Sequence, residues 1–208
     1  HTRLAAVSWA RRCVYETGDF PSHPLALEWL RQCPYVVCCD GAANTYIRSG
    51  RMPEAIVGDG DSLLPDIKER YASLIHSEAE QETNDLSKAF RFCLSQERKR
   101  ITIMGATGKR EDHTIGNVSL LADYMEQAEV SMMTDYGIFV PIREDSMFES
   151  YIGQQISVFN MNSTALSAEG LAYPLSVFTN WWQGTLNEAL ARHFIIRTEG
   201  KVLVFRVF

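Results

Sequence analysis

The chain has 208 residues, of which 46% are hydrophobic and 22% are charged. This composition is typical of an ordered globular protein rather than a disordered one. Twenty basic and twenty-six acidic residues give a net charge of −6, so we expect no nucleic-acid partner.

Other sequence features bear on where the protein acts. No apolar run reaches the roughly 18 residues that a membrane-spanning helix needs, so we expect no membrane partner. The apolar stretch 4–10 is short and is followed by Arg11 and Arg12, which argues against a secretion signal. The five cysteines show no CxxC or His-Cys spacing. We interpret them as reduced core thiols of a cytoplasmic protein.

Strand-like and helix-like runs alternate up to about residue 128. The clearest strands are 35–39, 55–57 and 101–104. Apolar residues recur at helical spacing in two segments, 86–94 and 115–125. This order predicts an α/β N-terminal domain, residues 1–128, with a mostly parallel sheet flanked by helices.

The helical period disappears after Glu129. Short β-rich segments follow at 130–134, 138–142, 156–160 and 194–208. The last of these resembles a terminal hairpin that turns at Glu199 and Gly200. Residues 129–208 are therefore expected to form an all-β, sandwich-like C-terminal domain.

Five short motifs occur in a fixed order in the predicted α/β part. They are Asp-Gly-Ala-Ala-Asn at 40–44, Gly-Asp-Gly-Asp-Ser at 58–62, Gln-Glu-Thr-Asn-Asp at 81–85, Gly-Ala-Thr-Gly at 105–108 and Arg-Glu-Asp-His at 110–113. Each falls where a strand-like run ends or a helix-like run begins, which is where open α/β sheets gather ligands. Asp59 and Asp61 face the same way in an extended chain, about 6.5 Å apart along the backbone, and can share one cation. Together the motifs indicate a magnesium-dependent phosphate site.

Taken singly, each motif also has a structural explanation. Asp40 and Gly41 could form a turn, and Asp112 stands where a helix cap would be. Thr83, Asn84 or Asp85 can cap the helix-like segment that follows them. Lys88 either points at phosphates or forms an i,i+3 pair with Asp85.

Three further features remain open. The Gly105–Gly108 loop could cradle a phosphate with its backbone N–H groups while Lys109 or Arg110 supplies charge, although it lacks the P-loop pattern. His113 could be a general base, but we favour a structural role. Trp181 and Trp182 are typical of a core or interface, and a flat cationic ligand is the functional alternative.

The ordered set resembles the thiamine pyrophosphokinase family over most of the chain. Residues 40–44 resemble its Asp-Gly-Gly-Ala-Asn, and 58–62 match its Gly-Asp-x-Asp-Ser. Residues 81–86 resemble Gln-Asp-x-Thr-Asp-Leu, and 105–113 resemble Gly-x-x-Gly-x-Arg-x-Asp-His. Residues 169–175 are similar to a late Gly-Leu-x-Tyr-Pro-Leu segment.

The resemblance implies transfer of a pyrophosphoryl group from ATP to the hydroxyl of thiamine, which yields thiamine diphosphate and AMP with Mg²⁺ as cofactor. It also implies a homodimer that binds thiamine between its subunits. By this resemblance Asp59, Asp61 and Asp85 hold magnesium, and Asp40 and Asp112 complete the catalytic carboxylates. The residues expected at the nucleotide are Asn44, Gln81, Lys88, Gly105, Gly108 and Arg110. Those expected at thiamine are Thr179, Asn180 and Trp181.

The chain departs from the family pattern at four positions. Glu82 stands in place of Asp, Asn84 in place of Thr, Lys109 in place of a common Gly, and Thr179 in place of Ser. Two rival functions stay open at this point. One is another magnesium-dependent transferase that uses nucleotides, because Asp59-x-Asp61 alone is shared more widely. The other is a non-catalytic regulator that binds thiamine or a nucleotide.

Overall fold

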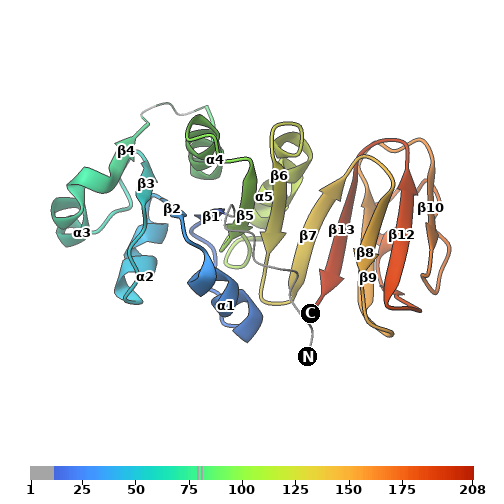
Figure 1. The fold of residues 1–208 in the computed structure, drawn as a ribbon. Coiled ribbons are helices and arrows are strands. Elements are labelled where there is room, and N and C mark those ends of the chain that lie inside the picture. The colour runs from blue at the N-terminus through green and yellow to red at the C-terminus, as the bar shows by residue number, and fades with distance from the viewer. Residues whose placement is uncertain (1–11, 79, 81) are drawn as a thin grey trace. The chain divides into compact units, whose positions relative to one another are not determined.

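The computed structural model describes residues 12–78, 80 and 82–208. Its residues divide into two compact units (Figure 1). The first unit contains the chain up to Val118 and Gln127–Asp135, and the second contains Ser119–Glu126 and Tyr136–Phe208. None of the described helices is both long enough and apolar enough to cross a membrane.

In the described part of the first unit, six parallel strands form the sheet. Their order in the sheet is β6-β5-β1-β2-β3-β4. Each neighbouring pair in this order is parallel. The bounds of the strands are β1 Arg12–Tyr15, β2 Val36–Cys39, β3 Ala55–Gly58, β4 Ile75–Ser77, β5 Arg100–Met104 and β6 Glu129–Met133.

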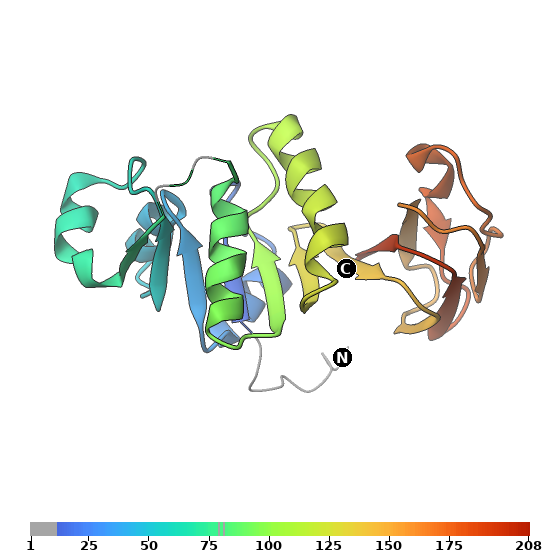
Figure 2. The ribbon, with the colours of Figure 1, turned by 90° about the horizontal axis from the view of Figure 1, so that it is seen from above.

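Helices connect these strands, as Figure 2 shows. They are α1 Pro24–Gln32, α2 Ala42–Arg48, α3 Pro65–Arg70 with the 3-10 turn η1 Ala72–Leu74, α4 Asp85–Ser95 and α5 Glu111–Tyr124. Helix α4 buries Leu86, Ala89, Phe90 and Cys93, the apolar stripe expected from the sequence. The alternation of strands and helices therefore produces the predicted parallel α/β unit.

The order of the strands fixes where ligand-binding loops can gather. The chain runs from β1 through β2 and β3 to β4 in one direction, and then returns to place β5 on the other side of β1. The loops that follow β1, β2, β3 and β5 thus leave the same carboxyl edge around this reversal. In open α/β sheets this is the position at which ligands bind.

The second unit is all-β, as the loss of helical period predicts. Four antiparallel strands follow the order β11-β9-β13-β7, and three more follow the order β10-β12-β8. Their bounds are β7 Gly137–Ile142, β8 Ser146–Glu149, β9 Gln155–Asn160, β10 Leu166–Glu169, β11 Asn187–Glu188, β12 His193–Thr198 and β13 Val202–Val207, with the 3-10 turn η2 Trp181–Gly184 before β11.

The prediction of a terminal hairpin at 194–208 is wrong. The chain does turn between Thr198 and Val202, but β12 pairs with β8 and β10 whereas β13 pairs with β7 and β9. The two strands lie in different sheets because their alternating apolar side chains meet in one core. Phe194 and Ile196 of β12 belong to the same buried cluster as Val202 and Val204 of β13.

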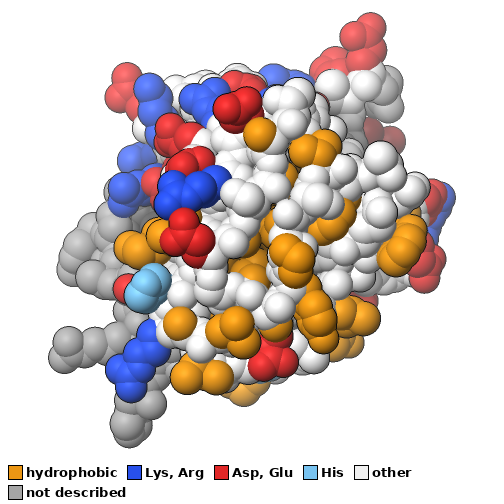
Figure 3. Space-filling model, turned by 90° about the vertical axis from the view of Figure 1, so that its right-hand side faces the viewer, with side chains coloured by type: hydrophobic (Ala, Val, Ile, Leu, Met, Phe, Trp, Pro, Cys, Tyr) orange, Lys and Arg blue, Asp and Glu red, His pale blue; other side chains and the backbone are white. Residues whose placement is uncertain are grey.

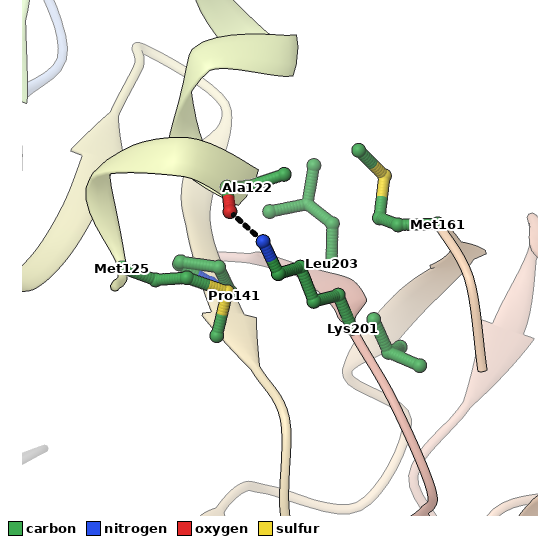
Figure 4. A pocket seen from close by; sticks show the side chains of 7 residues that line it. Ala122, Met125, Pro141, Met161, Lys201 and Leu203 are labelled. Carbon is green, nitrogen blue, oxygen red and sulfur yellow. Dashed lines mark hydrogen bonds between the residues drawn. The ribbon is translucent and has the colours of Figure 1, made fainter.

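The boundary between the units also differs from the one expected at residue 128. Strand β6 had been assigned to the all-β part, yet it pairs in parallel register with β5, and Asp135 still belongs to the first unit. The last turns of α5, from Ser119, belong with the second unit instead. There Lys201 Nζ donates to the carbonyl oxygen of Ala122 at 2.7 Å (Figure 4). The same Nζ forms a 2.8 Å ion pair with Glu126. A lysine at this position satisfies a terminal helix carbonyl and favours the negative end of the helix dipole.

Candidate active site

The predicted carboxylates follow the strands whose loops share one edge of the first unit. Asp40 directly follows β2, and Asp59 and Asp61 follow β3. Asp85 is the first residue of α4. The parallel sheet therefore gathers acidic groups from motifs that lie far apart in the sequence.

Asp40 is the most buried of these groups, with 2% of its surface exposed. Its Oδ2 accepts a hydrogen bond from the Ser62 backbone N–H at 3.0 Å. Its Oδ1 is buried and has no hydrogen-bond partner among the atoms that the structure describes. Burial raises the pKa of Asp40, and the negative charges of Asp85 and Asp59 raise it further. Such an orphaned oxygen is suited to a cation or a proton donor from a ligand.

The backbone at Asp40 is also unusual. Asp40 has a positive φ of 27°, which few residues other than glycine adopt. Gly58 lies against it, because a Cβ at Gly58 would come within 2.7 Å of the Asp40 Cβ. The second motif therefore needs glycine at this position so that Asp40 can lie against the end of β3.

Asn44 ties the first motif to the second. Its Nδ2 donates to the Ser62 carbonyl oxygen at 2.8 Å, and its Oδ1 accepts from the Leu64 N–H at 3.0 Å. Within the loop, Asp59 Oδ1 accepts from the Asp61 N–H at 3.1 Å, as in an Asx turn. The amide of Asn44 thus holds the loop that carries the two aspartates.

At the start of α4, Asn84 is the cap among the three alternatives. Its side chain accepts from the Ser87 N–H at 3.0 Å. Lys88 is buried and forms the i,i+3 ion pair with Asp85 at 3.1 Å. Burial acts to lower the pKa of Lys88, but the hydrogen bond and charge of Asp85 outweigh it, with help from Glu80 and Asp59, and the pKa is raised. The neighbouring carboxylates therefore stabilise the protonated, positively charged form of Lys88.

The loop after β5 adopts a conformation that needs its glycines. Gly105 and Gly108 have φ of +64° and +81°. A Cβ at Gly105 would lie 2.6 Å from the Tyr15 ring, and one at Gly108 would lie 2.1 Å from Asp19 Oδ2. Lys109 also has a left-handed φ of 59°, and its Nζ donates to the Thr17 carbonyl oxygen at 2.6 Å. A glycine would adopt this backbone angle at less cost than lysine, which fits the departure noted at this position.

Asp112 does not cap α5, which corrects the expectation from the sequence. The helix begins at Glu111, so Asp112 lies inside its first turn. Arg110 donates to both carboxylate oxygens, from Nη2 at 2.6 Å and from Nε at 3.1 Å. The hydrogen bond from Arg110 lowers the pKa of Asp112. Both side chains are mostly exposed, so this pair can open toward a ligand at little energetic loss.

Glu16 and Asp19, which no sequence motif marked, join this region. They lie in the loop after β1, which is bound to the phosphate-loop candidate by the hydrogen bonds Glu16 N to Met104 O, Gly18 N to Gly105 O and Asp19 N to Thr107 O. Burial raises the pKa of Glu16, and the charge of Asp85 adds to this effect. The signal that could have found them is an acidic pair directly after a short apolar run, 13–15.

Asn117 is a third residue that the sequence analysis missed. It is buried in α5, accepts from Asn84 Nδ2 at 3.3 Å and donates to the Ala106 carbonyl oxygen at 3.0 Å. It therefore connects the cap of α4 to the loop after β5. The departure from Thr at position 84 is part of this contact, because the Asn84 amide supplies the hydrogen-bond donor.

The donor set fits a magnesium ion that is shared with a ligand. No three His, Cys, Asp or Glu side chains of residues 12–78, 80 and 82–208 are grouped closely enough to hold a metal on their own. Magnesium usually takes only one or two carboxylates together with waters and substrate phosphates. The oxygen donors and the orphaned Asp40 Oδ1 are compatible with that mode, whereas a cage made by the protein alone is not present in the described part.

The three residues predicted at thiamine lie in the second unit. Gln183 Oε1 accepts from the backbone N–H groups of Thr179 and Asn180 at 3.0 and 2.8 Å, which closes a capping box at η2. Trp181 packs edge-on against Phe159, with ring centroids 5.9 Å apart, and 44% of its surface is exposed. A rigid turn therefore presents a partly exposed indole. Gln81 lies outside the described residues.

A small hollow in the second unit is a poor alternative site. It is lined by Ala122, Met125, Pro141, Met161, Lys201, Val202 and Leu203. Figure 4 shows Lys201 reaching across it toward the end of α5. The lysine is already bound to Ala122 and Glu126, and no lining residue is acidic.

Replacement of Asp40 with Asn tests the electrostatics of the site. The folded-state pKa is raised above the usual 3.8, so the folded protein binds the proton more tightly than the unfolded chain does. The stability that this tighter proton binding contributes is fully present below the pKa that Asp40 has in the unfolded chain. It is lost as the pH rises through the pKa that Asp40 has in the folded protein. In the absence of metal, Asp40→Asn should therefore raise the free energy of unfolding at pH 7 and flatten its decline above pH 4. Urea unfolding across this pH range measures both effects.

The exposed Asp66 in the first turn of α3 provides the matched control. Asp66→Asn should not raise the free energy of unfolding at pH 7. Equal or lower stability of Asp40→Asn at pH 7 would contradict the electrostatic assignment.

Two family models match the chain. The thiamin pyrophosphokinase catalytic domain matches residues 26–133, and the thiamin pyrophosphokinase substrate-binding domain matches residues 137–205. Thiamine pyrophosphokinase 1 of Oryza sativa subsp. japonica is 30% identical over 129 residues, which cover 50% of this chain and 49% of the relative. Thiamin pyrophosphokinase 1 of Caenorhabditis elegans is 28% identical over 138 residues, covering 62% and 56%. The chain thus spans about half the length of the curated relatives that it matches.

Solved structures share the fold. Thiamine pyrophosphokinase from Bacillus subtilis superposes with a TM-score of 0.81 at 20% identity, covering 95% of this chain and 98% of that one. Yeast thiamin pyrophosphokinase gives 0.77 at 16% identity, covering 95% and 86%. The catalytic-domain model alone matches more than half of the residues. The chain belongs to the thiamine pyrophosphokinase family.

Proposed function

We propose that this protein transfers the pyrophosphoryl group of ATP to the hydroxyl of thiamine, which yields thiamine diphosphate and AMP. The observation that carries the proposal is the gathering of Asp40, Asp59 and Asp85 at one edge of the sheet, close enough for each to affect the charge of a neighbour. These residues lie within the match to the catalytic domain. Attack at the β-phosphorus requires charge neutralisation and in-line positioning more than a covalent intermediate.

The residues divide into distinct roles in this reaction. Asp59, Asp61 and Asp85 are the proposed ligands of Mg²⁺, of which one or two at a time would hold the ion together with phosphate oxygens of ATP. When bound, the ion neutralises phosphate charge and orients the phosphates for transfer. Arg110 and the buried Lys88 supply positive charge, and the N–H groups around Gly105 and Gly108 face the phosphates. A carboxylate that does not coordinate the ion, Asp40 or Asp112 among them, accepts the proton of the thiamine hydroxyl.

For thiamine itself, we propose Thr179, Asn180 and Trp181 as the binding residues. The thiazolium ring is a flat cation, and an indole face attracts such a ring by roughly 0.5 to 2 kcal/mol. The capping box fixes the turn before the substrate arrives, so little conformational entropy is lost there on binding. A cytoplasmic location fits this reaction and the five thiols of the described structure.

Chromatography of the products tests the reaction directly. Purified protein with ATP, magnesium and thiamine should release AMP and thiamine diphosphate in equal amounts, and omission of magnesium or thiamine should abolish both. ADP with thiamine monophosphate would indicate a simple kinase. Ligand binding without any turnover would indicate a regulator and contradict the proposal.

Asp61→Asn should reduce turnover by several powers of ten, because it removes a negative ligand at the proposed metal. Asp61 is exposed, so the fold should survive. Asp85→Asn should act similarly, but it also weakens the ion pair of a buried lysine and needs a check of the fold by circular dichroism. Asp66→Asn serves as the control and should retain full activity. Near-normal turnover of Asp61→Asn would contradict the metal assignment.

We also propose a homodimer. The second unit exposes several large apolar side chains: Tyr136, Met147, Tyr151, Ile152, Tyr173, Val177, Trp181, Trp182, Leu186 and Leu190. Figure 3 shows apolar side chains spread over the face at the right of Figure 1. Exposed apolar area of this kind supports contact with a second copy of the chain.

Sedimentation at micromolar concentration should therefore give a dimer. Trp182→Asp, at a tryptophan that is 73% exposed, should shift the equilibrium toward the monomer without unfolding it. A wild-type monomer with full activity would contradict both the dimer and a thiamine site shared between subunits.

A further inference from the structure

Two cysteines meet at the edge of the first unit opposite the acidic site. Cys13 lies at the amino end of β1 and is buried, and Cys33 follows the last residue of α1 and is partly exposed. Cys13 pairs in register with Val36, the first residue of β2. Because the strands are parallel, this is the amino edge of the sheet, whereas Asp40 follows the carboxyl end of β2.

One carbonyl oxygen holds the two cysteines together. The backbone N–H of Cys13 donates to the Tyr35 oxygen at 3.0 Å, and Cys33 Sγ donates to the same oxygen at 3.3 Å. The Cys13 side chain also lies near enough to Cys33 to lower the pKa of its thiol. The two cysteines are therefore neighbours, with Cys13 held on β1 and Cys33 held directly after α1 by the same carbonyl oxygen.

The surroundings distinguish Cys33 from the other thiols. The Arg12 and Arg98 guanidinium groups each lie 5.1 Å from the centre of the Tyr35 ring. The interaction with the Cys13 side chain is the largest cause that lowers the pKa of Cys33, and the Arg12 charge lowers it further against the opposing effect of burial. Burial raises the pKa of Cys93 to about 12 and raises those of Cys38 and Cys39 well above the ordinary value. A thiolate is the reactive form, so Cys33 is the thiol that the protein leaves open to oxidation.

We propose that Cys33 and Cys13 form an oxidation site at which a hydroperoxide converts the two neighbouring thiols into an intramolecular disulfide. In the first step the Cys33 sulfur attacks one peroxide oxygen. The O–O bond breaks, Cys33 becomes a sulfenic acid, and hydrogen peroxide leaves one oxygen as water. In the second step the Cys13 sulfur attacks the sulfenic sulfur, the S–S bond forms, and the hydroxyl leaves with the Cys13 proton as a second water. Two thiols are oxidised by two electrons and one peroxide is reduced.

This chemistry is independent of pyrophosphoryl transfer, because it uses the opposite edge of the sheet and none of the proposed catalytic residues. Closure of the bond would tie the start of β1 to the end of α1. Its state is measured by mass, so the result does not depend on activity.

The experiment exposes the full-length protein to a small excess of hydrogen peroxide, blocks the remaining thiols and maps the peptides without reduction. We expect the monomer to become two hydrogens lighter, two of its five thiols to disappear, and one linked peptide pair to contain Cys13 and Cys33. Reduction with dithiothreitol should restore both thiols. Cys93→Ser should give the same linked pair, and Cys33→Ser should leave its remaining thiols unoxidised.

Several results would overturn the proposal. They are a sulfinic acid at Cys33 beside an intact Cys13 thiol, a Cys33–Cys93 link, a disulfide between two chains, or no loss of thiol in the folded protein. The wild-type peptide map alone separates these outcomes if a variant fails to fold.

Discussion

Repulsion among carboxylates at the carboxyl edge of one parallel sheet is the constraint on which the rest of this structure depends. Two like charges about 4 Å apart repel by on the order of 4 kcal/mol at an effective dielectric near 20. The fold nevertheless buries Asp40 with one unsatisfied oxygen, and the charges of Asp59 and Asp85 raise its pKa. The buried Lys88 offsets part of this repulsion through its ion pair with Asp85. We propose that the remaining negative charge attracts a cation and its phosphate ligand to this edge.

The supporting residues are arranged to hold these charges in place. Asn44 uses both ends of its amide to fix the loop that carries Asp59 and Asp61. Asn117 connects the cap of α4 with the loop after β5. Such contacts restrain the acidic groups before any ligand arrives, which reduces the entropy lost on binding. The close packing of these loops also requires glycine at positions 58, 105 and 108, because a Cβ at each would collide with a neighbour.

Much of this arrangement could be predicted from the sequence. The strands before the motifs at 40–44, 58–62 and 105–108 were visible as apolar runs, and their alternation with helices was enough to predict a parallel sheet. Strand β4, which precedes the motif at 81–85, was not predicted. The predictions that failed needed information about contacts in space, which a local sequence pattern does not contain. Alternating apolar residues in 194–208 predicted two strands but could not tell that β12 and β13 pair in different sheets. Helix α5 begins at Glu111, before the predicted cap Asp112, because capping patterns do not fix a helix boundary to the residue. Glu16, Asp19 and Asn117 lacked any motif, since their roles arise from the neighbours of β1 and α5 in space.

The central claim is that the carboxylate edge binds nucleotide through magnesium, and calorimetric titration tests it most directly. The ligand is α,β-methylene ATP, which cannot release its pyrophosphoryl group. With magnesium present, the protein should bind this analogue at least tenfold more tightly than in its absence, and Asp59→Asn should remove most of that difference. Equal affinity with and without magnesium, unchanged by Asp59→Asn, would contradict the account.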